Sequence, residues 1–69
     1  MTDSEATQRL EVMISHLRAF RRELADAEQE GFHLISERAR EEIRNLRALI
    51  RRHCDRNGIP LPKDVLQDG

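Results

Sequence analysis

Apolar residues recur along the first half of the chain at alternating spacings of three and four, which is the pattern of a helix that packs one stripe against another helix. The pattern breaks at Gly31 and resumes after it in a new phase. Carrying the first phase through Gly31 would put Arg38 and Arg52 on the apolar stripe, so one continuous helix is disfavoured. The two stripes are Leu10, Met13, Leu17, Phe20, Leu24 and Ala27, and then Phe32, Ser36, Ala39, Ile43, Leu46, Ile50 and His53.

The break predicts a hairpin turn. Gly31 can adopt the left-handed conformation that ends a helix, and the apolar Phe32 after it can fold back onto the preceding turn. If the chain reverses there, every stripe position faces a stripe position, with Leu17 opposite Leu46 near the middle. We therefore predict an all-α fold, an antiparallel two-helix hairpin.

The boundaries follow from local signals. The first helix is expected over about residues 4–30, the turn at 31–32 and the second helix over about 33–57. Gly58 and Pro60 end the second helix, since glycine favours the closing conformation and proline cannot continue it. The hairpin domain is thus residues 1–59, and Pro60 and Pro62 predict an extended C-terminal tail over 60–69.

The short length of the chain favours burial against a partner. The chain has 69 residues, and a domain of that size buries only about 60% of the surface that its unfolded form exposes. Its one cysteine, Cys54, cannot form an intrachain disulfide. Ile14 and Leu49 also flank the seam on opposite edges, so the stripes are wider than one hairpin needs. We expect a homo-oligomer, such as a homodimer forming a four-helix bundle, or docking on another helical protein.

These features favour a non-enzymatic protein-protein interaction module: an adaptor, a co-chaperone or a regulator. Twelve basic and thirteen acidic residues give a net charge of -1, so no overall field attracts nucleic acid. The residues predicted to bind the partner lie on the apolar faces and are Met13, Ile14, Leu17, Leu49 and Ile50.

An alternative function rests on four arginines of the second helix, Arg40, Arg44, Arg47 and Arg51. Their spacings of four, three and four form a basic ridge that could lie along phosphates, as in a small dimeric nucleic-acid-binding regulator. Glu37 and Glu41 interrupt the ridge, so a solvated face with helical ion pairs is the favoured interpretation.

Candidate chemistry is sparse. The residues of the kind that ligate transition metals are His16, His33, His53 and Cys54. They lack the three- or four-residue spacing that places two ligands on one helical face. A two-helix chain also offers no concave pocket for catalysis. We therefore expect no enzyme activity, metal, cofactor or small-molecule substrate.

The sequence also predicts a cytoplasmic protein. Residues 1–8 are polar and lack the apolar core of a secretion signal. The longest uninterrupted apolar run, residues 12–14, is far shorter than the ~20 residues that cross a membrane. A lone cysteine is typical of a reducing compartment.

Finally, the run Arg21-Arg22-Glu23-Leu24, then Gly31-Phe32 and the segment leading to Ala39-Arg40, resembles the YscE/PscE family of type III secretion co-chaperones. The likeness covers about residues 10–50. It implies a short helical hairpin that packs on a tetratricopeptide-type chaperone in the cytoplasm and helps keep a needle subunit monomeric. The arginine-dense end of the second helix and the proline-containing tail depart from that family.

Overall fold

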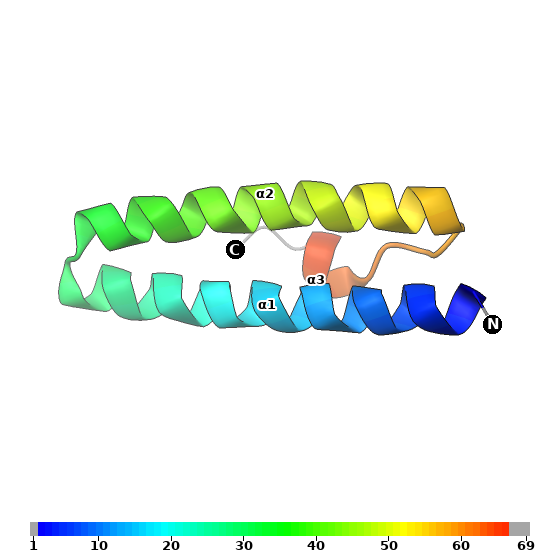
Figure 1. Cartoon of the computed structure of the whole chain (residues 1–69). Coiled ribbons are helices and arrows are strands. Elements are labelled where there is room, and N and C mark those ends of the chain that lie inside the picture. The colour runs from blue at the N-terminus through cyan, green and yellow to red at the C-terminus, as the bar shows by residue number, and fades with distance from the viewer. Residues whose placement is uncertain (1, 67–69) are drawn as a thin grey trace.

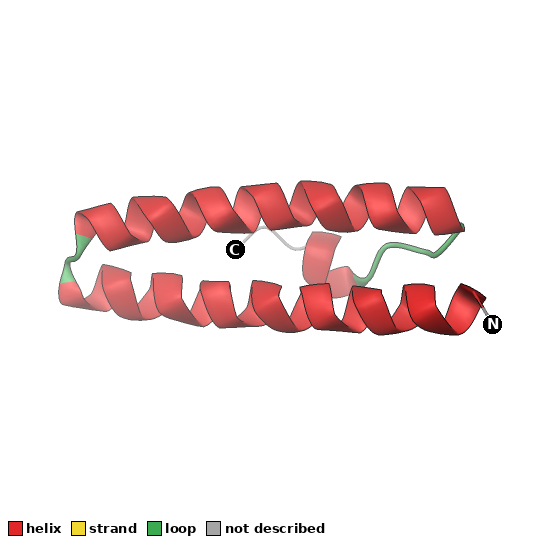
Figure 2. Ribbon diagram, viewed as in Figure 1, coloured by secondary structure: helices red, strands yellow, loops and turns green. Residues whose placement is uncertain are grey.

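Two long helices lie side by side and run in opposite directions (Figure 1). The computed structural model describes residues 2–66, with the side chains of residues 5–63 and 65. Helix α1 spans Thr2–Glu30, α2 spans His33–Asn57, and a single helical turn, α3, spans Lys63–Leu66. Helices and short loops account for all the described residues (Figure 2). The predicted all-α antiparallel hairpin is confirmed.

Each long helix ends at a glycine in the left-handed conformation, with φ 76° at Gly31 and 65° at Gly58. The following residue then donates a backbone hydrogen bond five residues back: Phe32 N to Ala27 O and Ile59 N to Cys54 O, each at 2.9 Å. This closure satisfies carbonyls that the helix end would otherwise leave without donors. Both glycines act as the sequence predicted, because only glycine adopts this backbone without a steric cost.

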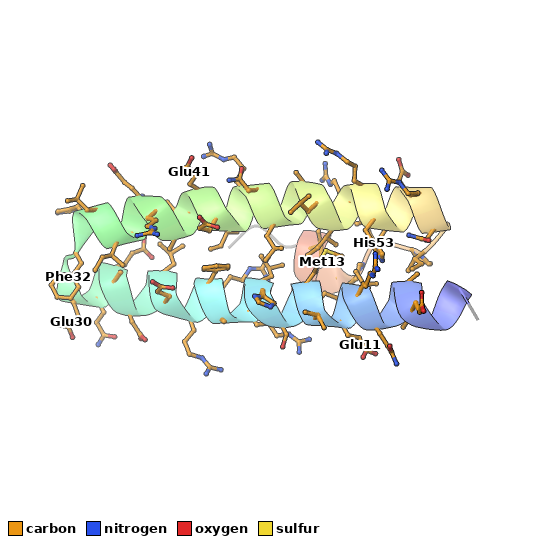
Figure 3. The ribbon with its side chains drawn as sticks, in the orientation of Figure 1. Glu11, Met13, Glu30, Phe32, Glu41 and His53 are labelled. Atoms are coloured by element: carbon orange, nitrogen blue, oxygen red, sulfur yellow. The ribbon has the colours of Figure 1, made fainter. Side chains whose placement is uncertain are left out.

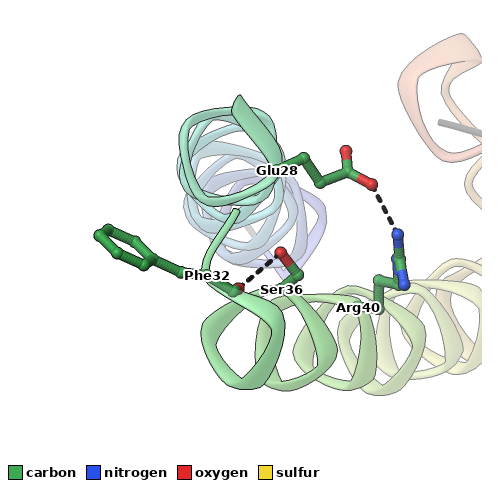
Figure 4. A network of polar contacts seen from close by, with 4 residues as sticks. All are labelled: Glu28, Phe32, Ser36 and Arg40. Carbon is green, nitrogen blue, oxygen red and sulfur yellow. Dashed lines mark hydrogen bonds and ion pairs between the residues drawn. The ribbon is translucent and has the colours of Figure 1, made fainter. Parts of the chain in front are cut away.

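The turn between α1 and α2 is held by polar contacts (Figure 4). The Phe32 carbonyl accepts hydrogen bonds from the backbone N and the Oγ of Ser36, each at 2.9 Å. Arg40 pairs with Glu28 across the turn at 2.5 Å, which offsets acidic charge at the negative end of α1. Phe32 lies in the turn before α2, as predicted, but it does not fold back onto α1: its ring points away from both helices, and 53% of it is exposed.

The core runs along the predicted seam. Leu17 and Ile50 are completely buried, and Met13, Ile43 and Leu46 pack against the cluster to which they belong. Near the turn the buried seam residues are small: Ala27, Ser36 and Ala39. Large apolar side chains therefore gather in the middle of the hairpin and toward its open end.

Over residues 60–66 the C-terminal tail differs from the prediction of an extended segment, and residues 67–69 of that prediction lie outside the described residues. After Gly58 the chain turns back along the hairpin and forms α3 beside the two long helices (Figure 1). Val65 is completely buried in the cluster of Leu17, Ile50 and Cys54. Burying a valine side chain contributes about 1.5 to 3 kcal/mol relative to leaving it exposed, which favours docking of the tail, while Pro60 and Pro62 lie in the non-helical segment before α3.

Truncating Leu17 tests this core. Leu17→Ala should lower the free energy of unfolding by about 2 to 5 kcal/mol, because it removes a fully buried side chain and leaves a cavity. Leu34→Ala is the matched control, since Leu34 is 82% exposed and such surface changes stay within about 0.5 kcal/mol. Equal losses for the two variants in chemical denaturation would contradict the described packing.

Candidate interaction surfaces

The groove between α1 and α2 has two edges, and the tail covers one of them. On this tail edge, Ile59 and Leu61 pack against the buried cluster beside Cys54. Arg47 fixes the segment there, because its Nε donates a hydrogen bond to the Val65 carbonyl at 3.1 Å. A cavity of about 830 Å³ remains between the tail and α2. The tail thus occupies a surface that a partner helix could otherwise use.

The predicted basic ridge lies on this same edge. Arg40 is engaged with Glu28, and Arg47 is half-buried beneath the tail. Arg44 and Arg51 are exposed and line the 830 Å³ cavity. The four arginines are therefore not one uniform row of available cations, since two of them already serve intrachain contacts.

Cys54 lies under the tail and is only 2% exposed. Burial raises the pKa of its thiol, and the negative charge of Asp55 adds to that effect. Reactivity depends on the thiolate, so both access and ionisation disfavour attack by this sulfur. Cys54 is a packing residue of the tail edge.

The opposite edge is open. Arg9, Val12, Met13 and Leu49 line a groove of about 660 Å³ there, together with Arg52 and Arg56. Val12 is 56% exposed and Leu49 52% exposed. We call this surface of α1 and α2, which includes Arg9, Val12, Met13 and Leu49, the open face. No described residue of the tail lines its groove.

The structure separates the five residues that the sequence predicted to bind a partner. Leu17 and Ile50 are completely buried, so they belong to the intrachain core, which corrects their placement on a contact surface. Ile14 is half-buried and packs against the cluster that contains Val65. Met13 and Leu49 are on the open face. The predicted partner-binding residues omitted Val12, whose signal was an apolar side chain further round the helix from the seam.

His53 closes the open end of the hairpin. Its Nε2 donates a hydrogen bond to the Ala6 carbonyl at 2.7 Å, so that nitrogen carries the proton. Its side chain and that of Met13 lie between the two helices (Figure 3). His16 and His33 are exposed, and within residues 2–66 no three His, Cys, Asp or Glu side chains come together in a cluster that could hold a metal ion.

No helix in the described part of the chain has the length and hydropathy needed to cross a bilayer. Comparison with known proteins gives no matching family model, and no significant match among curated proteins or solved structures. The resemblance to the YscE/PscE family therefore stays a prediction from the sequence.

Thiol labelling tests whether the tail covers Cys54. The unmodified chain should react slowly with a thiol reagent at neutral pH, and Val65→Ser should accelerate labelling because the tail loses its buried anchor. Lys63→Ala, at an exposed tail position, is the control and should leave the rate unchanged. Fast labelling of the unmodified chain would show that the tail does not cover the sulfur.

The same burial predicts a pH dependence. Because the folded state raises the pKa of Cys54, the unfolded chain loses its thiol proton first as pH rises. The free energy of unfolding should therefore fall as pH increases above the ordinary thiol pKa, and Cys54→Ala should remove this component of the fall.

Proposed function

We propose that this chain is a non-enzymatic helical interaction module that binds another helical surface through its open face. The observation that carries the proposal is the groove lined by Val12, Met13 and Leu49, which keeps exposed apolar side chains on both helices after the chain has folded its own tail onto the other edge. A second helical surface would remove these side chains from water and extend the packing toward a four-helix bundle.

The dimensions of the chain support this role. The molecule is about 45 Å long and 17 Å across. The area of one side is therefore of the same order as the ~800 Å² that each partner buries in a stable protein interface. Charged residues border the exposed apolar positions, as a polar rim borders the apolar centre of an interface. We place its action in the cytoplasm, in line with the lone buried cysteine.

The alternative function, nucleic-acid binding through the arginine ridge, draws less support from the contacts. Arg40 pairs with Glu28 and Arg47 donates to the tail, so phosphates would compete with intrachain partners at two of the four positions. An adaptor of the YscE/PscE kind fits within the proposal, because it too would act by covering a helical surface.

Photocrosslinking from single positions tests the proposed face. A photoreactive amino acid replacing Val12 or Leu49 should give adducts with a helical segment in the cells from which the protein comes, because both positions would lie against the partner. Gln29 is the matched control: it is exposed on α1 and points away from the seam in the helical repeat. Mass spectrometry of the adducts identifies the bound segment.

Adducts confined to positions 12 and 49 would support the open face as the binding surface. Equal adducts from position 29 would indicate unspecific contact and contradict the proposal. Adducts formed only from a probe at the exposed Arg44 would move recognition to the arginine ridge and favour the alternative function.

A further inference from the structure

The groove of the open face has an apolar half and a basic half. Val12, Met13 and Leu49 form the apolar half, nearer the middle of the hairpin. The basic half lies toward the open end and contains the arginines of the groove, Arg9, Arg52 and Arg56, with Glu5 as the acidic residue of the lining. Three arginines against one glutamate give this half a formal charge of +2. A molecule bound along the groove therefore contacts apolar side chains at one end and positive charge at the other.

Both helices present this order in the same direction (Figure 1). On α1, Arg9 lies three residues before Val12, and on α2, Arg52 and Arg56 lie three and seven residues after Leu49. The helices are antiparallel, so both steps lead toward the open end of the hairpin. At 1.5 Å per residue, Arg52 and Arg56 are about 4.5 Å and about 10.5 Å beyond Leu49 along the helix axis. Each wall of the groove thus changes from apolar to basic within one helical turn.

The three arginines are not neutralised within the chain. Among the described residues, none of the side chains of Arg9, Arg52 and Arg56 takes part in a hydrogen bond or an ion pair, and all three residues are exposed. On the tail edge the situation differs, because Arg40 pairs there with Glu28 and Arg47 donates to the tail. An acidic group in the groove would therefore pair with these arginines without breaking an intrachain contact.

From this arrangement we infer that the open face binds an acidic amphipathic helix of another protein, laid lengthwise in the groove. This inference rests on the proposed function and names the chemistry of its partner. A helix parallel to α2 has the same rise per residue as α2. When its large apolar side chain covers Val12 and Leu49, its positions three or four residues and seven residues further toward the open end lie beside Arg52 and Arg56. These positions share one face of a helix, so the partner carries an apolar residue and two acidic residues at that spacing.

The other side of the apolar half fixes the orientation of this pattern. Asn45 and Glu42 continue the stripe of Leu49 toward the turn, four and seven residues before it. These two residues supply no cation, and one of them is acidic. Acidic side chains of the partner are therefore accommodated toward the open end and repelled in the opposite direction.

Other partner chemistries match the groove less well. A basic helix would bring like charges against three guanidinium groups. An entirely apolar helix would remove those groups from water without giving them partners, which costs free energy. The phosphates of a nucleic acid would match the arginines but leave the apolar side chains of Val12 and Leu49 uncovered. An acidic amphipathic helix satisfies both halves of the groove at once, in the manner of helices that bind in apolar grooves.

Binding of designed peptides to the full-length chain tests the inference. Each probe is a stapled helical peptide with two leucines one turn apart. In the first probe, glutamates follow the second leucine at three and seven residues; the second probe has the reverse order, and the lysine probes replace both glutamates by lysine. In isothermal titration calorimetry, one of the two acidic probes should bind about tenfold more tightly than its lysine counterpart. Added salt should narrow the difference, because the charges are exposed.

Charge reversal in the protein locates the site. Arg52→Glu with Arg56→Glu should reverse the preference, so that the lysine probe binds more tightly. The matched control, Arg44→Glu with Arg51→Glu, makes the same change in net charge at exposed residues of the tail cavity and should keep the preference for the acidic probe.

Two further variants complete the test. Arg52→Gln with Arg56→Gln should abolish the preference without placing negative charge at the end of α2, and it replaces the reversed variant if circular dichroism shows that the latter loses helicity. Glu5→Gln should tighten binding of the acidic probe, because it removes the like charge from the groove lining.

Equal affinities for acidic and lysine probes, or a loss of preference in the tail-cavity control, would overturn the inference. A chain that assembles with itself through positions 12 and 49 would give the open face to a second copy and would also overturn it. Adducts from those positions with a helix that lacks the acidic pattern would overturn the inference and leave the proposed function in place. The absence of both adducts and peptide binding would remove both.

Discussion

Two helices lying side by side can bury only one stripe on each, and the rest of this structure follows from that limit. The stripe of α1 and the stripe of α2 meet at Leu17 and Ile50, which are completely buried. A chain of 69 residues gains little core from such a seam, so any further apolar group that can be covered adds a large share of the stability. Burial of the apolar residues beside the seam therefore matters for the stability of the whole hairpin.

The two edges of the seam differ in how far their apolar residues are covered. On the tail edge the chain supplies its own cover, with Val65 inserted beside Cys54 and held through its carbonyl by Arg47. On the open face, Val12 and Leu49 stay exposed, and the charges around them have no intrachain partners among the described side chains. Covering one edge internally leaves the open face as the surface that we propose for association.

Much of the fold could be predicted because its signals are local. The phase of the apolar stripe and the two glycines each depend on a few neighbouring residues, and they fixed both long helices and the turn between them. The tail could not be predicted in this way, since the burial of Val65 depends on a groove that Leu17, Ile50 and Cys54 form only in the folded hairpin. The proposed contact surface could be located only in part for the same reason. Periodicity showed that the stripes are wider than one hairpin can bury. It could not show that the tail covers the edge where Ile14 lies and leaves the edge of Leu49 exposed.

An isotope-filtered nuclear Overhauser spectrum of a mixture of labelled and unlabelled chains tests the account most directly, because it separates contacts within a chain from contacts between chains. We predict contacts of the Val65 methyl groups with Ile50 within one chain, and no contacts of Val65 or Ile59 with a second chain. Contacts of Val65 or Ile59 with a second chain would contradict the account, since they would show that the tail edge forms the interface and that the open face is not the surface through which this hairpin associates.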